Sequence, residues 1–443
     1  MNKKMSLLTG AALGVFLAAG ATAQADAKTK AKPHHAPAES LAAKQAQEIE
    51  LLKAQVESLS ERLLAIDQQQ AQVKAQADQA QAAAQAAQAE TAAQIKTIPA
   101  TVKTQVAAAL PKPKPSWADS TQVSGRMYFN LSNIEQKSNG AKVAPSGTGF
   151  DIKRFYVGID HKFNDTFSGN ITTDMNYVSN DGETQVYIKK AYLQAKLSDA
   201  AIIRVGSADL PWVPFAEDVY GYRFIENTVA DRTKFGTSAD WGVHASGKLM
   251  DGKLGYAVAM INGNGYKNPS RAKSVDFEGR VNLNIDKAVF AVGGYTGKLG
   301  KEVTGGVATP HTATRVNALA AWVDKKYRVG VEYFSAKDWN NVTTAAEDKA
   351  DGYSVFGSYS FTPEISAFGR WDRVKPSKTL KASEKDNYFN LGLNWEPTKI
   401  VDLALVYKRD KVDNGLLSTS NGTIGGSNSG TYDEVGLFGQ FRW

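Results

Sequence analysis

Arginine and lysine recur at alternate positions in short segments between residues 118 and 443. Arg126 lies between Gly125 and Met127, and Arg154 precedes Phe155. A guanidinium group stays charged and binds phosphate or carboxylate oxygens through two parallel hydrogen bonds, and rings of Arg or Lys are how pores select anions. If the apolar positions of each segment face lipid, the cations expected to line a water-filled lumen are Arg126, Arg154, Lys162, Lys190, Arg204, Lys248, Arg280, Arg328, Arg370, Lys408 and Arg442.

The same face of these segments also carries carboxylates. They are Asp174, Asp276, Glu278, Glu332, Asp372 and Glu434. Because both signs are present, inward charges that only pair across strands and hydrate the lumen are an equally good interpretation. Inward Tyr128, Tyr156 and Tyr192 also permit a sugar-binding lumen.

Residues that would carry other chemistry are missing or misplaced. The chain has no cysteine and five histidines, and only the adjacent His34 and His35 are close enough in sequence to suggest metal binding. No Gly-x-Ser-x-Gly elbow occurs, and Gly297-Lys298 is followed by Leu299, which lacks the hydroxyl of a phosphate loop. The formal charge of +7 is too small to indicate nucleic acid. The sequence therefore predicts a protein that is not an enzyme and has no cofactor and no metal.

The elements that would position these charges are sixteen strands of alternating polarity. We place them at 121–132, 151–163, 167–176, 185–197, 201–207, 240–249, 253–261, 274–285, 288–297, 314–323, 327–336, 352–361, 365–373, 387–396, 401–409 and 432–443. Every second connection is a tight turn, such as Asp286-Lys287. The other connections are mostly long and fall at 133–150, 177–184, 208–239, 262–273, 298–313, 337–351, 374–386 and 410–431.

Short turns on one side and long loops on the other are typical of a bacterial outer-membrane barrel. Each apolar stripe is about as long as the 9–11 residues that a tilted strand needs to cross a bilayer. A soluble β-sandwich is the alternative, but it would have about seven to nine strands. We therefore predict an all-β transmembrane barrel of sixteen antiparallel strands over residues 118–443, preceded by a long helical coiled coil.

The longest connection, 208–239, is rich in aromatic residues. Exposing so many aromatic rings to water would be unfavourable. The segment is therefore expected either to fold into the barrel and narrow it or to pack on a neighbouring subunit. We favour a constriction loop. Its residues expected to meet the solute are Tyr220, Tyr222, Arg223, Arg232 and Lys234, and its carboxylates Glu217, Asp218, Glu226 and Asp231 argue against a purely positive constriction.

The N-terminal quarter has a different composition. Lys3, Lys4 and an apolar run to Ala19 predict a secretory signal peptide over residues 1–25, cleaved after Ala23 or Ala25. Residues 26–39 are polar and are expected to form a disordered tail.

Residues 40–96 contain no Gly or Pro and repeat apolar residues at a three–four spacing, which predicts a coiled coil. The repeat runs through Ile49, Leu52, Val56, Leu59, Leu63, Ile66 and Val73. It does not decide the oligomer number, and a long solvated helix is the alternative. Residues 97–117 alternate Pro and Lys and are expected to be a stiff linker.

Several short motifs resemble the phosphate-selective porin O and P family. They are Phe150-Asp151-Ile152-Lys153-Arg154-Phe155-Tyr156-Val157-Gly158, Thr173-Asp174-Met175, Lys190-Ala191-Tyr192-Leu193 and Ile203-Arg204-Val205-Gly206, followed by Pro211 and Pro214-Phe215. The resemblance implies a trimer of sixteen-stranded barrels whose pores carry an arginine ladder, and Arg154 and Arg204 lie in the matching motifs. One departure concerns phosphate specificity, because Gly206 is followed by Ser207 where members of the family often have a lysine.

Taken together, these patterns predict an outer-membrane porin that passively admits small anions such as phosphate. The expected assembly is a homotrimer in outer-membrane lipid, with an N-terminal stalk in the periplasm that touches peptidoglycan, and no nucleic acid as a partner. A sugar-specific porin, a general diffusion porin and a structural tether between outer membrane and cell wall are the alternatives.

Overall fold

The computed structural model describes residues 41–97, 116–177, 184–303 and 305–443. It divides the chain into two units, 1–112 and 113–443. In the first unit, α1 (Leu41–Thr97) is one uninterrupted helix of 57 residues. Every side chain of α1 whose burial is described is exposed. No helix among the described residues combines the length and apolarity needed to cross a membrane. The predicted signal peptide, tail and nearly all of the linker lie outside the described residues.

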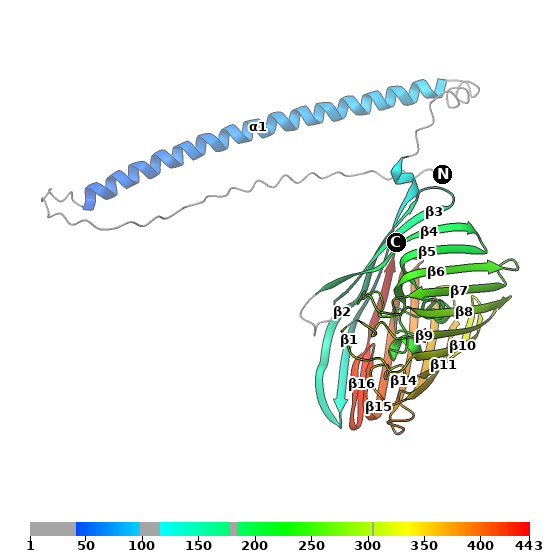
Figure 1. The fold of residues 1–443 in the computed structure, drawn as a ribbon. Helices are drawn as coiled ribbons and strands as arrows, with labels where there is room; N and C mark the ends of the chain where they lie inside the picture. Colours follow the sequence, from blue (N-terminus) through cyan, green and yellow to red (C-terminus); the bar gives the residue numbers. More distant parts are fainter. Residues whose placement is uncertain (1–40, 98–115, 178–183, 304) are drawn as a thin grey trace. The chain divides into compact units, whose positions relative to one another are not determined.

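The second unit is a closed barrel of sixteen antiparallel strands, as predicted (Figure 1). A short 3₁₀ helix, η1 (Trp117–Ser120), precedes it. The strands are β1 (Thr121–Ser138), β2 (Ala141–Lys162), β3 (Phe167–Tyr177), β4 (Gln185–Ser198), β5 (Ala201–Asp209), β6 (Ala239–Leu249), β7 (Leu254–Ile261), β8 (Asp276–Ile285), β9 (Ala288–Gly297), β10 (Ala313–Val323), β11 (Tyr327–Lys337), β12 (Lys349–Ser360), β13 (Ile365–Lys375), β14 (Lys385–Thr398), β15 (Val401–Thr419) and β16 (Gly422–Arg442). Each strand pairs with its neighbours in sequence, and β1 closes on β16, with Arg126 opposite Arg442.

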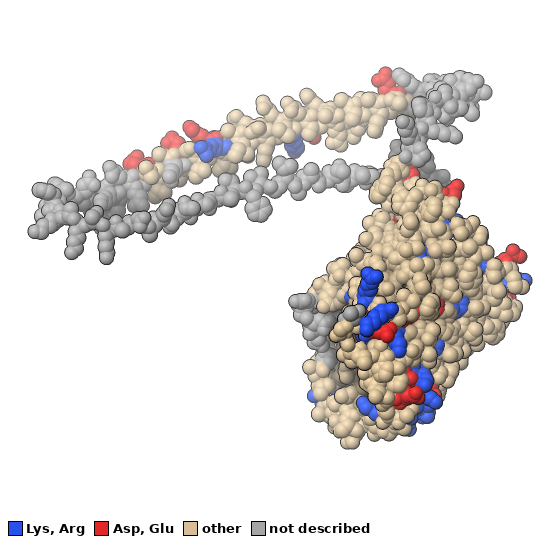
Figure 2. All heavy atoms as spheres, viewed as in Figure 1, with Lys and Arg blue, Asp and Glu red and all other residues tan. Residues whose placement is uncertain are grey.

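The two faces of the wall differ in the way the alternating sequence predicts. Along β11, Val329, Val331 and Tyr333 are 42–55% exposed, whereas the intervening Glu332 and Phe334 are at most 2% exposed. Successive side chains of a strand point to opposite faces, so the exposed row, which is apolar, faces outward, and the row with Glu332 and Phe334 faces inward. Figure 2 agrees, because most of the visible outer surface of the barrel carries neither acidic nor basic side chains.

Short connections gather at one end of the barrel, here called the turn end. They include 199–200 and 286–287, and both ends of the barrel chain, at β1 and β16, lie there too. The opposite loop end holds the long connections, including 210–238 between β5 and β6.

Two predicted loops are wrong. Residues 133–150 and 410–431 continue the strands instead of forming long loops, so that β1–β2 and β15–β16 are long hairpins. The β1–β2 hairpin turns at Asn139 and Gly140, whose positive φ angles of 48° and 85° suit a tight hairpin turn. These extensions are rich in Gly, Ser, Asn and Thr, so they lack the apolar alternation from which the other strands were predicted.

Two β-bulges alter which lysines face inward. In the β1–β2 ladder Tyr128 pairs with Arg154 and Phe129 with Ile152, so Lys153 is an extra residue. In the β3–β4 ladder the extra residue is Lys189. A bulge re-aims a side chain that strict alternation would place on the other face. Lys153 accordingly lies 3.9 Å from the inward Glu434.

Candidate pore lining

The connection 210–238 lies inside the barrel. It contains α3 (Val213–Tyr220) and α4 (Val229–Arg232). Trp212 is fully buried; its backbone N donates to Glu278 at 2.9 Å and its indole Nε1 donates to Glu332 at 2.8 Å. The ring rests where Gly293 leaves space, because a Cβ on Gly293 would lie 2.6 Å from it. The segment is therefore fitted to the inner wall.

Three apolar clusters join this segment to one half of the wall. In the first cluster, Trp212 and α3 pack on β9, β10 and β12. In the second, Phe224 and Ile225 pack on β1, β13, β15 and β16. In the third, Val229, Ala230 and Phe235 pack on β11–β13. Tyr222 stacks on Phe368 with ring centroids 4.4 Å apart. The inward segment consequently covers mainly the β9–β16 side.

A buried ion network fixes the end of the segment. Arg232 contacts Asp372 at 3.0 Å, Asp386 at 2.5 Å and Asp410 at 2.9 Å, and all four side chains have no exposed area. Arg370 binds the same Asp372 at 2.6 Å. These charges hold the fold together and have no access to a solute in the lumen.

Lys408 belongs to a second buried network. Its ammonium lies 2.6 Å from Glu434 and 3.4 Å from Glu226. Burial opposes ionisation of Glu226, yet the ammonium groups of Lys408 and Lys153 lower the pKa of this carboxyl. Glu226 thus remains the charged link between the inward segment and β15.

Two further arginines of the barrel wall donate hydrogen bonds to the backbone of the inward segment at α3 and just before it. Arg328 donates to the carbonyl oxygens of Asp218 at 2.9 Å and Val219 at 2.6 Å, near the helix C-terminus, where cations are favourable. Arg280 donates to the carbonyl of Pro211 at 2.8 Å and lies 3.9 Å from the ring centroid of Phe215.

The other side of the lumen is hollow. A cavity of about 680 Å³ lies between α3 and the inner faces of β1–β5, towards the turn end; we call it the lumenal hollow. Tyr156, Gly158 and Asp160 line it, and the outward Phe155, Val157 and Ile159 do not. Its charged lining consists of Arg126, Lys189, Lys190, Arg223 and Arg442 with Asp160, Asp209, Glu217 and Asp218.

Some of these lining charges are paired. Lys190 contacts Asp209 at 2.5 Å, and Arg223 bonds to Glu217. Burial raises the pKa of the Glu217 carboxyl, against the attraction of Arg223 and Lys189. Five cations and four carboxylates line the hollow. Of the cations, Arg442 pairs with two carboxylates outside this lining, Asp402 at 2.8 Å and Glu396 at 3.2 Å.

Arg126 and Lys189 are the lining cations whose described contacts are mainly aromatic. Arg126 donates to the hydroxyl of Tyr128 at 3.3 Å, and Lys189 lies 4.7 Å from the ring centroid of Tyr156. Neither side chain forms an ion pair with a carboxylate among the described residues. Both side chains therefore line the hollow without a carboxylate partner of their own.

The remaining predicted residues are spread along the barrel. Arg154 lies 3.7 Å from Asp174, and Arg204 binds Gln194 at 2.8 Å beside a smaller hollow. Lys162 pairs with Asp165 in a turn, whereas Lys248 and Lys234 are exposed at strand or loop ends. Tyr220 is buried against Phe356. The structure therefore brings Arg126, Lys190, Arg223 and Arg442 together at the lumenal hollow, and separates the others from it.

Sequence reasoning missed Lys153 and Lys189, because strict alternation places them on the outer face. Two consecutive lysines, Lys189-Lys190, in the middle of a strand were the available sign of a bulge, since a lipid-facing lysine at that depth is costly.

Comparison with solved structures relates the barrel to porins. An anion-selective porin from Comamonas acidovorans superposes with a TM-score of 0.55 at 12% identity, covering 73% of this chain and 99% of that one. The outer membrane channel DcaP of Acinetobacter baumannii gives 0.52 at 13% identity, covering 73% and 97%. The trimer form of OmpT, an outer membrane protein of Vibrio cholerae, gives 0.51 at 12% identity, covering 73% and 99%.

No family model matches the chain, and no curated protein sequence matches it. At these identities the similarity describes the fold of the barrel alone.

Proposed function

We propose that the chain is an outer-membrane porin, a passive diffusion channel for small solutes. The observation that carries this proposal is the combination of an apolar outer face with a hollow, charged interior in one closed barrel. An apolar outer band suits lipid, and a closed barrel leaves no unpaired strand edge in it. A polar interior suits water and hydrophilic solutes.

The favoured solutes in this proposal are small anions, with phosphate-like oxyanions first. Support comes from Arg126 and Lys189, two cations of the lumenal hollow that contact tyrosines and form no ion pair with a carboxylate among the described residues. The four carboxylates of the lining limit the preference, so we expect weak to moderate selectivity. The inward segment, which fills the β9–β16 side, would set the size limit.

Planar bilayers test both parts. Purified protein should form steady channels, and in a KCl gradient the reversal potential should have the sign of chloride preference. Neutral phosphate buffer added to one side should shift or block the chloride current. A reversal potential of the cation-selective sign would overturn the anion assignment, and failure to conduct would overturn the porin assignment.

A sugar-specific porin is the second candidate, favoured by the aromatic lining. Tyr128, Tyr156, Tyr192 and Trp443 all border the lumenal hollow, and stacked aromatic rings bind sugar faces through their apolar surfaces. Millimolar sugars that block the ionic current, with phosphate having no effect, would favour this candidate.

For the first unit we propose a periplasmic stalk that pairs as a coiled coil and joins three copies of the chain. Along α1, Ile49, Leu52, Leu59, Leu63 and Ile66 form an uncovered apolar row and are 52–61% exposed, which a parallel partner helix would bury. At about 1.5 Å per residue the helix is roughly 85 Å long, long enough to approach peptidoglycan. If deleting residues 40–96 leaves conductance intact but weakens the cell envelope, the stalk serves as a tether.

A further inference from the structure

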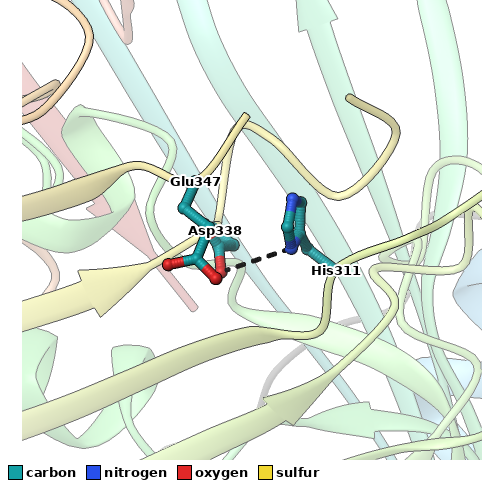
Figure 3. A group of neighbouring side chains, drawn as sticks. All are labelled: His311, Asp338 and Glu347. Atoms are coloured by element: carbon teal, nitrogen blue, oxygen red, sulfur yellow. Dashed lines mark ion pairs between the residues drawn. The ribbon is translucent and has the colours of Figure 1, made fainter. Parts of the chain in front are cut away.

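Three potential metal ligands meet at the loop end of the barrel. His311 belongs to the connection between β9 and β10, whereas Asp338 and Glu347 flank the connection between β11 and β12. Their potential ligand atoms all lie within 4.8 Å of one another. Figure 3 shows the imidazole of His311 directed towards the carboxylate of Asp338.

We propose that His311, Asp338 and Glu347 form a binding site for a divalent transition-metal ion of the Zn²⁺ type. Three protein ligands and one water complete a tetrahedral shell, with bonds of about 2.0–2.2 Å and ligand atoms therefore roughly 3.3 Å apart. The ligand atoms need to approach one another by up to about 1.5 Å. Glu347 is exposed and its side chain is 62% accessible, so it can make most of this movement.

The ligand types select the metal class. Imidazole suits zinc, copper and nickel, whereas calcium and magnesium take shells of oxygen ligands. The site offers one nitrogen ligand and two carboxylates on neighbouring loops. A transition metal consequently fits it better than Ca²⁺ or Mg²⁺.

The imidazole of His311 forms no hydrogen bond with a described residue that would account for its position. His311 Nδ1 lies 3.9 Å from Asp338 Oδ2, too far for a hydrogen bond. Its Nε2 is buried and has no hydrogen-bond partner among the residues that the structure describes. Asp338, in contrast, is held in place, because its Oδ1 accepts the backbone N–H of Asp348 at 2.8 Å.

Lys337 supplies the positive charge of the metal-free site. Its ammonium lies 3.7 Å from Asp338 and 3.3 Å from Glu347, where it balances the two carboxylates. The lysine side chain is 45% exposed, so it can swing into solvent when a metal ion arrives. Metal and ammonium would compete for the same carboxylates.

Metal binding would join two loops, and the one between β11 and β12 also touches the inward segment. Trp339 follows Asp338 directly and donates from Nε1 to the carbonyl of Lys234 at 3.0 Å. The ring of Trp339 also packs on Phe235. A bound ion would thus stiffen the anchor of the inward segment from the loop end.

Calorimetric titration of the purified full chain with ZnCl₂ tests the site. All variants carry His34→Ala and His35→Ala, because that pair could bind metal on its own. We expect one ion per chain, with His311→Ala and Glu347→Gln each weakening binding at least about tenfold. His161→Ala, a matched control at the turn end, should leave binding unchanged.

The direction in which Lys337→Met changes the affinity for Zn²⁺ is the decisive result. Removing a competing ammonium at this distance should tighten Zn²⁺ binding about fivefold or more, whereas loss of a merely structural ion pair would weaken it or have no effect. Zinc affinity that is unchanged in His311→Ala, or unchanged or lowered in Lys337→Met, would overturn the proposal and indicate adventitious binding only.

Discussion

Replacing Arg232 should release the inward segment from the wall. Arg232→Met removes three contacts between side chains that are all without exposed area, and it leaves the carboxyl groups of Asp386 and Asp410 buried without that partner. Breaking a buried ion pair by removing one member costs about 3–5 kcal/mol. Since each 1.4 kcal/mol is a tenfold change, the population with the segment detached should rise by a factor of roughly a hundred to a few thousand.

Single-channel recording in planar bilayers measures the consequence. A detached segment widens the lumen, so the variant should show larger conductance with frequent transitions between levels. Lys234→Met is the matched control, because this cation is two residues away and exposed. Asp386→Asn, which weakens one of the three pairs, should act in the same direction by less. Steady conductance of wild-type size in Arg232→Met would refute the anchoring role.

Three other substitutions test separate parts of the structure. Trp212→Ala removes a fully buried ring and should cost about 3–5 kcal/mol, seen as a lower midpoint of heat unfolding on gels; an unchanged midpoint would argue against close packing. Arg126→Ala combined with Lys189→Ala should move the reversal potential in a KCl gradient towards cation preference, and no movement would place the anion path elsewhere. Ile66→Asp should break a coiled coil and lower the mass found by sedimentation, whereas Leu51→Asp, outside the apolar row, should not; equal effects would contradict the proposed register.

The strand pattern was predictable because lipid and water impose opposite demands on successive residues. The sixteen predicted strands are all present, and alternation of the kind seen in β11, where Val331 faces outward and Glu332 inward, is what predicted them. Alternation of apolar and polar residues is required only where lipid covers the outer face of the wall. The extended hairpins over 133–150 and 410–431 were therefore missed, because nothing forces their sequences to alternate.

The charges of the interior were harder to predict, because facing inward does not decide whether a side chain meets water. The alternation predicts that Lys408 and Arg126 both face inward. Lys408 is nevertheless fully buried in ion pairs, whereas Arg126 borders the lumenal hollow. The difference depends on where the inward segment packs, which is a long-range property. The metal ligands were missed for a related reason, since His311 and Asp338 belong to different loops and share no local spacing.

The most direct test of the proposed conducting path is chemical modification inside the lumenal hollow. The chain contains no cysteine, so Lys189→Cys introduces a single thiol there, and Val331→Cys places one on the outer face. A negatively charged methanethiosulfonate reagent should reduce the conductance and the anion preference of Lys189→Cys while leaving Val331→Cys channels unaltered. Complete labelling of Lys189→Cys without any change in current would contradict the proposal that solutes pass along the β1–β5 wall.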